Sequence, residues 1–302
     1  MPNPPTLIAA TPAVEQTGCP SCGAPGMHAF CPHCGERRAA EADYSLRGFL
    51  GEALETVTNL DTRVGRTAHA LLLRPGLLSA SHFEGVRRPY LGPLQLFLLC
   101  NVLFFFLQTL FGIGLFTLTL DNALVQFNGL FLDFAARDGM TFRELRAADP
   151  EAFAAYATEF QRAASTQART LVLAMVPFFA AVSYLLYGRD RRYYAQHLVF
   201  SLHTYAFLML TVAATALAFW TAVQGARATA SPAALTVLRN IEGVLPSALM
   251  LLFGIHIALS ARRALGGGHL ATLLKAIALL GGWFVILVLY RGVLFLVTIR
   301  ML

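Results

Sequence analysis

Residues 91–115 read LGPLQLFLLCNVLFFFLQTLFGIGL, a run without a charged side chain. A helix needs roughly 20 mostly apolar residues to cross a bilayer, so this run predicts a transmembrane helix. Four later segments are also long and mostly apolar, at about 168–187, 197–223, 241–261 and 270–297. The sequence therefore predicts an all-α membrane protein, a polytopic bundle of about five transmembrane helices over residues 91–302. Arg291 interrupts the last run, so a continuous span and a broken or re-entrant end both stay open there.

The composition supports a membrane protein over a soluble one. Of the 302 residues 56% are hydrophobic and only 13% are charged, whereas a soluble domain carries about a quarter charged residues. The formal net charge is +6, which in a soluble protein would suggest nucleic acid. Here the basic residues lie between apolar segments, where anionic headgroups favour them. We therefore expect the lipid bilayer as partner, and no nucleic acid.

Basic residues also predict the orientation. They precede the first span and recur between the second and third spans and between the fourth and fifth, at Arg63, Arg66, Arg74, Arg87, Arg88, Arg189, Arg191, Arg192, Arg262 and Arg263. The loop at 117–167 is acidic on balance, and Asp149-Pro150-Glu151 in it is a good helix start. The positive-inside rule puts the N-terminus in the cytoplasm, with this loop and the C-terminus extracytoplasmic.

A cysteine module occupies residues 18–36. Cys19-Pro20-Ser21-Cys22-Gly23 and Cys31-Pro32-His33-Cys34-Gly35 are two copies of Cys-Pro-x-Cys-Gly, and each predicts a zinc knuckle. Two knuckles supply four thiolates in the closed tetrahedral set of structural Zn²⁺, at Cys19, Cys22, Cys31 and Cys34. The alternative is a pair of disulfides, which a cytoplasmic location disfavours. Residues 1–17 are rich in Pro and Ala, lack a signal-peptide pattern and predict a disordered leader.

Between the module and the first span, residues 43–90 predict amphipathic helices that lie on the membrane surface or pack against the bundle. One helix follows Ser45 to about Leu60, and another covers 63–73 before Arg74-Pro75-Gly76 breaks it. Arg74, Arg87, Arg88 and Tyr90 are candidate contacts for an anionic lipid headgroup or a partner. Alternatively they are a positive-inside anchor with Tyr90 in the interfacial belt.

Polar residues inside the predicted spans are candidate functional sites, because polar groups are costly in lipid. In the third span His197, Ser201 and Thr204 share one face at helical spacing, while His203 lies on another. With two residues from later spans they form a candidate intramembrane polar site, comprising His197, Ser201, His203, Thr204, His256 and Arg291. The alternative for most of them is helix packing through hydrogen bonds.

Several motifs resemble one family. The two Cys-x-x-Cys pairs, Asn59-Leu60-Asp61, the stretch Leu72 to Gly76, and Phe83 to Tyr90 with Pro93 resemble the bacterial domain-of-unknown-function 3667 family. Residues 194–200 followed by His203 are similar to a later membrane motif of that family, although Gln196 stands where the family pattern has an acid. The resemblance implies a zinc-ribbon multi-pass membrane protein, and we expect it in the bacterial inner membrane. It supplies no activity.

Three functions follow as hypotheses. A non-enzymatic scaffold, assembly factor or regulatory subunit, docking a cytoplasmic protein through the ribbon, fits a closed metal site beside a bundle without a catalytic constellation. The alternative is a transporter or lipid-handling protein using the intramembrane polar site. A membrane hydrolase has least support, because the chain has no Gly-x-Ser-x-Gly, His-Glu-x-x-His or paired intramembrane carboxylates.

Overall fold

The computed structural model describes residues 18–25, 29–31, 33–36, 63–111, 118–126, 135–137, 140–188 and 193–302. The expected leader at 1–17 and the expected helix after Ser45 lie outside these residues. The described elements are α2 (Arg63–Leu73), α3 (Leu77–Phe83), α4 (Pro93–Phe111), α5 (Leu120–Gln126), β1 (Ala135–Arg137), β2 (Met140–Thr141), α6 (Phe142–Ala148), α7 (Pro150–Tyr187), α8 (Tyr194–Ala228), α9 (Pro232–Leu265) and α10 (His269–Met301). The fold is thus helical, with one small antiparallel pair, β1–β2.

Five of the described helices are long and apolar enough to cross a membrane: α4, α7, α8, α9 and α10. The prediction of a multi-pass helical membrane protein is therefore confirmed. The helix α7 starts well before its apolar part, with the Asp149 side chain accepting from the amide of Ala152 at 2.9 Å and Pro150 in the first turn. The helix α10 continues through Arg291 to Met301, so the break left open in the sequence does not occur.

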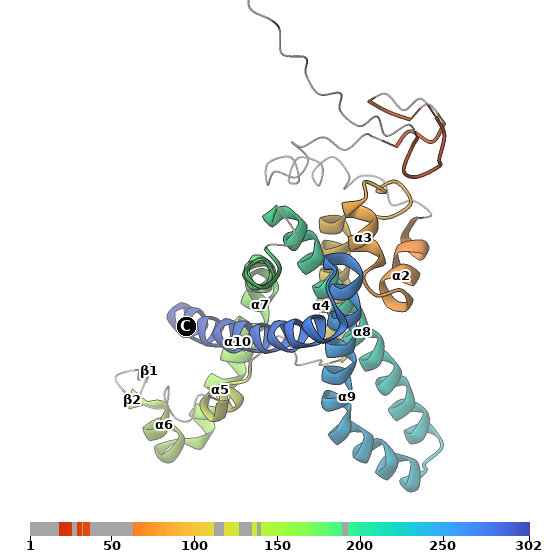
Figure 1. Ribbon diagram of the computed structural model, residues 1–302. Helices are drawn as coiled ribbons and strands as arrows, with labels where there is room; N and C mark the ends of the chain where they lie inside the picture. The colour runs from red at the N-terminus through yellow and green to blue at the C-terminus, as the bar shows by residue number, and fades with distance from the viewer. Residues whose placement is uncertain are drawn as a thin grey trace, which may run out of the picture.

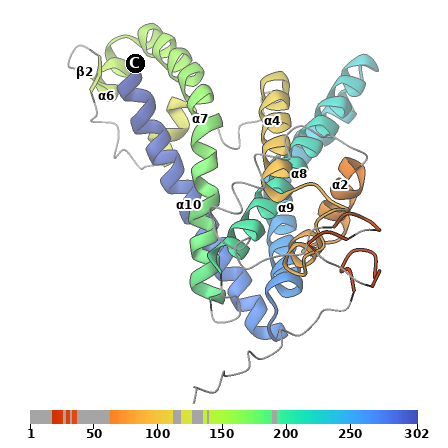
Figure 2. The ribbon, with the colours of Figure 1, turned by 90° about the horizontal axis from the view of Figure 1, so that it is seen from above.

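The spanning helices form two arms (Figures 1 and 2). One arm holds α4, α8 and α9, and the other holds α7 and α10; α7 also packs on α8, and α9 on α10. The cysteine module, α2 and α3 lie near one end of the bundle, where α7 and α9 end and where α4, α8 and α10 begin. We call this the ribbon end. The opposite end, the loop end, carries α5, α6, the β1–β2 pair and the last turn of α10.

Residues 63–92, which we call the elbow segment, contain α2 and α3 and pack against the bundle. Thr67 Oγ1 donates to Arg63 O at 2.8 Å and accepts from the amide of Leu91 at 3.0 Å, which ties α2 to the start of α4. Gly76 adopts φ 76°, and a Cβ there would lie 2.7 Å from the carbonyl oxygen of Ser260 in α9. Only glycine combines this left-handed backbone with so close an approach. The sequence signal that ends α2 therefore also sets the packing of α3 on α9.

At the loop end, aromatic packing joins the start of α6 to α7 and α10. Phe142 is fully buried, and its ring lies 5.5 Å from that of Tyr156 and 6.2 Å from that of Phe295. A capping box between Thr141 and Glu144 starts α6, and the pKa of Glu144 is lowered because the Thr141 amide and hydroxyl donate to its carboxylate. Side chains from β2, α6, α7 and α10 thus hold the loop end together.

Candidate metal centre and buried polar clusters

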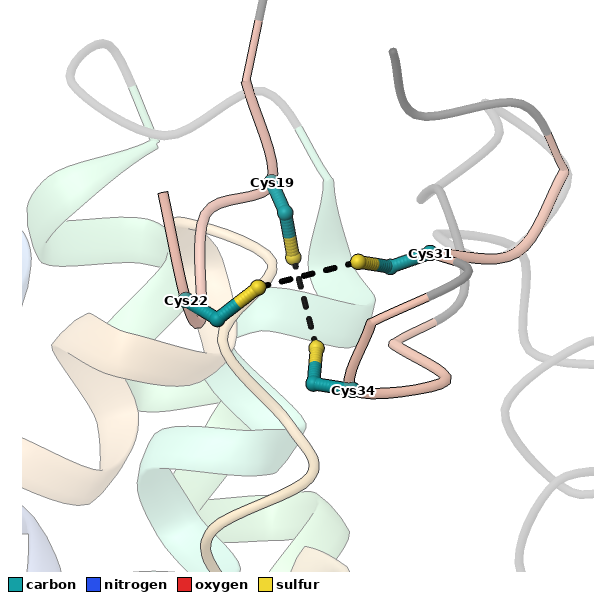
Figure 3. Close-up of side chains that lie close together, drawn as sticks. All are labelled: Cys19, Cys22, Cys31 and Cys34. Carbon is teal, nitrogen blue, oxygen red and sulfur yellow. Dashed lines mark hydrogen bonds between the residues drawn. The ribbon is translucent and has the colours of Figure 1, made fainter. Parts of the chain in front are cut away.

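The four cysteines of the module point toward a common centre (Figure 3). Their sulfur atoms lie within 4.8 Å of one another, with 3.6 Å between the sulfurs of Cys19 and Cys34 and between those of Cys22 and Cys31. A disulfide would need about 2.05 Å, and all four thiols are free. A tetrahedral ion with metal–sulfur bonds of about 2.3 Å separates its sulfurs by about 3.8 Å. The donor set therefore fits a four-coordinate metal ion.

Two equivalent turns produce this arrangement. The amide of Gly23 donates to Cys19 O, and that of Gly35 to Cys31 O, each at 2.8 Å. Both glycines have positive φ, 73° and 71°, which other residues adopt at a cost. The backbone amides of Cys34 and His33 hydrogen-bond to the sulfur of Cys31 and lower the pKa of that thiol to about 6. The repeated Cys-Pro-x-Cys-Gly motif thus aims its amides at the sulfurs, as the sequence predicted.

The described part of the module has almost no apolar core. Cys19 and Cys31 are 3% and 2% exposed, while Cys34 and Ala24 are the partly buried apolar residues packed against them. So small a core contributes little to the free energy of folding. A module of this kind depends on a bound ion for most of its stability.

A carboxylate next to the second knuckle joins the module to the elbow segment. Glu36 is 3% exposed, and its Oε2 accepts from the hydroxyl of Ser21 and from the backbone amides of Arg87 at 3.3 Å and Arg88 at 3.0 Å. The Arg88 guanidinium lies against Gly35, where an added Cβ would come within 2.0 Å of Nη1. We call this set of contacts the Glu36 clasp. The sequence alone did not indicate this clasp, because Arg87 and Arg88 lie 51 and 52 residues from Glu36 and no local motif marks Glu36.

The predicted headgroup residues do not form one group. Arg87 and Arg88 present their amides to Glu36, whereas Arg74 lines a cavity at the ribbon end and Tyr90 packs against the core of the bundle. The guanidinium of Arg88 faces the cysteine module, so its nearest described surroundings are protein. A role in contacting anionic headgroups stays a prediction for these residues.

The intramembrane polar residues separate into three places. The first is a cavity of about 10 Å³, the space of one water molecule, between α3, α8 and α9. His203 Nδ1 lies 2.9 Å from Ser79 Oγ, and His256 Nε2 lies 3.2 Å from Ser260 Oγ. Thr204 and Arg74 complete the polar lining. The buried Nδ1 of His256 has no hydrogen-bond partner among the described residues. We call this the histidine cavity.

The second place is the contact between α7 and α8. His197 Nδ1 lies 2.9 Å from Ser183 Oγ, and Ser201 Oγ donates to the carbonyl oxygen of Val176 at 2.7 Å. Both His197 and Ser201 are fully buried. These bonds join helices side by side, which is what polar side chains commonly do in membrane bundles.

The third place is near the loop end, where Arg291 Nη1 donates to Gln126 Oε1 at 2.8 Å. This bond joins α10 to the short helix α5. Arg291 therefore lies apart from both histidine clusters, and the six candidate residues do not form a single site. His203, Thr204 and His256 do come together, and Ser79 and Ser260 join them. The helical spacing of the polar residues in α8 could not predict Ser79, because Ser79 belongs to α3, which meets α8 only in the folded chain.

Residues 61–105 match the model of a family described as a protein of unknown function (DUF3667). The match confirms the family resemblance over the elbow segment and the first part of α4. The cysteine module and the motif at 194–203 lie outside the matched residues. Neither the curated proteins nor the solved structures gave a match to the chain.

Proposed function

We propose that this DUF3667 protein is a non-enzymatic multi-pass protein of the bacterial inner membrane whose structural zinc ribbon docks a cytoplasmic protein. The observation that carries the proposal is the Glu36 clasp, which holds a closed four-cysteine centre against the elbow segment. A closed thiolate set leaves no open position for catalysis and suits zinc. The metal therefore acts by folding the ribbon, and the clasp fixes the folded ribbon to the bundle.

An exposed aromatic ring supports the docking role. Phe30 directly precedes the ligand Cys31, and its side chain is 61% exposed. Aromatic side chains are enriched among the residues that dominate protein interfaces. A metal-folded turn holds such a ring in a defined position, which lowers the entropy lost on binding. Phe30 is thus the residue that we expect to touch a protein partner.

Crosslinking from native membranes tests the docking role. A photoreactive amino acid replaces Phe30, and a matched probe replaces Leu185, an exposed apolar residue of α7. We expect a protein adduct from position 30 that disappears when Cys19 and Cys31 are changed to serine, and lipid adducts from position 185. A probe at 30 that gives the same adducts with and without the cysteines contradicts docking by the folded ribbon. Metal analysis that finds no zinc in the purified chain contradicts the ribbon itself.

The location of the ribbon can be tested separately. The basic residues at the ribbon end favour a cytoplasmic N-terminus and an extracytoplasmic C-terminus under the positive-inside rule. Reporter fusions after Ser165 should then be active only as extracytoplasmic reporters. A cytoplasmic signal from this position would reverse the orientation and remove the ribbon from the compartment in which its partner is expected.

A second candidate function, transport or lipid handling by the bundle, is favoured by the histidine cavity. Two buried imidazoles and two serine hydroxyls surround the space of a single water molecule, and one buried nitrogen has no partner among the described residues. Such groups can pass a proton or hold a small ion. The flux of protons or small ions into proteoliposomes distinguishes the candidates. If the bundle transports, His203→Ala should abolish this flux, whereas deletion of residues 1–40 should not.

A further inference from the structure

A groove between the two arms lies outside the four-cysteine centre and outside the histidine cavity. It has a volume of about 530 Å³, within the range of about 300–1,000 Å³ typical of ligand sites. Its wall on α4 is apolar and is formed by Val102, Phe105, Phe106 and Leu110, and α7 closes the other side through Arg169. The groove is open along one side, so a molecule in the bilayer can enter it from the lipid.

The charge at the rim of the groove is positive. Arg169 directly precedes 170–187, the uncharged stretch of α7, and its Nη2 donates to Thr109 Oγ1 at 3.3 Å. The guanidinium has no carboxylate partner among the described residues, and no acid is among the residues that line the groove. A guanidinium binds phosphate well, since its planar fork matches two phosphate oxygens.

A second polar group lies deeper in the same groove. Asn101 is 9% exposed, and its buried Nδ2 has no hydrogen-bond partner among the described residues. A buried amide donor without a partner is costly, so it points to an acceptor supplied by an occupant. Asn101 and Thr109 are eight residues apart, about 12 Å along the axis of α4. A phosphate held by Arg169 and the glycerol ester carbonyl beneath it can bridge this span.

We propose that the groove binds one anionic phospholipid. Its phosphate contacts the Arg169 guanidinium, a glycerol ester carbonyl accepts from Asn101 Nδ2, and an acyl chain lies along Val102 and Phe106. This ligand matches the positive rim, the deeper amide donor and the apolar wall together. A lipid that only fills the space around the bundle would use the wall alone. This lipid contacts neither the ribbon nor the histidine cavity.

Lipid titration of the full chain tests the proposal. The protein is purified in detergent, stripped of lipid and titrated with phosphatidylglycerol, or with diacylglycerol of the same acyl chains, while bound lipid is counted by native mass spectrometry. We expect one tightly held phosphatidylglycerol, with diacylglycerol bound about tenfold more weakly because it lacks the phosphate. Arg169→Gln should weaken phosphatidylglycerol by a similar factor, and Arg169→Lys should restore part of the affinity.

Two further variants separate the contacts. Asn101→Leu removes the amide donor at similar size and should weaken phosphatidylglycerol and diacylglycerol alike. Arg162→Gln is the matched control, since Arg162 is exposed two turns earlier on α7 and does not line the groove; it should change nothing. Equal binding of phosphatidylglycerol and diacylglycerol would overturn the proposal, and so would disulfide crosslinking of two copies through a cysteine at position 106. The lipid comparison on the wild-type chain needs no variant to fold.

Discussion

The cysteine centre and the histidine cavity are both small polar clusters at the ribbon end, but they are built in different ways. In the cysteine centre the paired sulfurs are at most 15 residues apart, and two tight turns position them. In the histidine cavity His203 meets Ser79 across 124 residues, and packing of α3, α8 and α9 positions them. Local backbone geometry can place ligands without a core, whereas distant side chains need a packed core to hold them.

The elbow segment connects these two clusters. Through the amides of Arg87 and Arg88 it holds Glu36, and through Ser79 it reaches His203. Most of the residues matched by the family model are the elbow segment and the start of α4. If the two clusters are independent, damage to one should leave the other intact. Variants in the two clusters and in the elbow segment test this independence.

Loss of the metal ligands should have the largest effect. Cys31→Ser, or removal of metal by a chelator, should unfold residues 18–36, because the module has almost no apolar core of its own. Hydrogen exchange should show full loss of protection in the module, and faster exchange of the Arg88 amide. The thermal melting of the bundle should stay within about 2 °C of wild type. A large drop in bundle stability would mean that the two clusters are not independent.

Gly76→Ala should be the most damaging single change in the elbow segment. The added Cβ would lie 2.7 Å from Ser260 O on a backbone of φ 76°. Strain and displacement of α3 together should cost about 2–4 kcal/mol of the free energy of unfolding. Gly65→Ala is a matched control, because a Cβ there meets nothing within 4 Å. Metal content should not change, and equal melting of the two variants would contradict the tight contact with α9.

Ser79→Ala should destabilise the bundle by about 1–3 kcal/mol, since it leaves a buried nitrogen of His203 without its partner. Ser81→Ala on the same helix is the control, as its side chain is also buried and its hydroxyl makes no hydrogen bond to the described residues. Chemical denaturation measures both variants. If Ser79→Ala costs no more than Ser81→Ala, then the hydrogen bond to His203 contributes little.

Glu36→Gln should have the smallest effect, about 1 kcal/mol, because the amide can still accept hydrogen bonds but loses its charge. We expect the metal content to stay unchanged and the amide of Arg88 to exchange its hydrogen faster than in wild type. Glu84→Gln, in the same region but exposed, serves as the control. Slower metal loss in Glu36→Gln than in wild type would show that the clasp does not support the ribbon.

The sequence predicted more of the fold than of the sites. The apolar runs gave five spans whose helices were found, and Arg74-Pro75-Gly76 marked the end of α2. The long start of α7 followed from Asp149 and Pro150. These features depend on local propensity and on the thickness of a bilayer, which a single segment carries within itself. The continuity of α10 through Arg291 needed the structure, because Gln126 accepts from that guanidinium and comes from a distant helix.

The spans and the four cysteines that come together could be predicted from the sequence, because spacing along the chain is enough to set a helix length and a tight turn. The tertiary structure sets which polar residues meet. It separated His197 and Arg291 from His203, joined His203 to Ser79, and placed Glu36 under the amides of Arg87 and Arg88. Such contacts join segments that are far apart in sequence, and their partners become visible only when the helices pack.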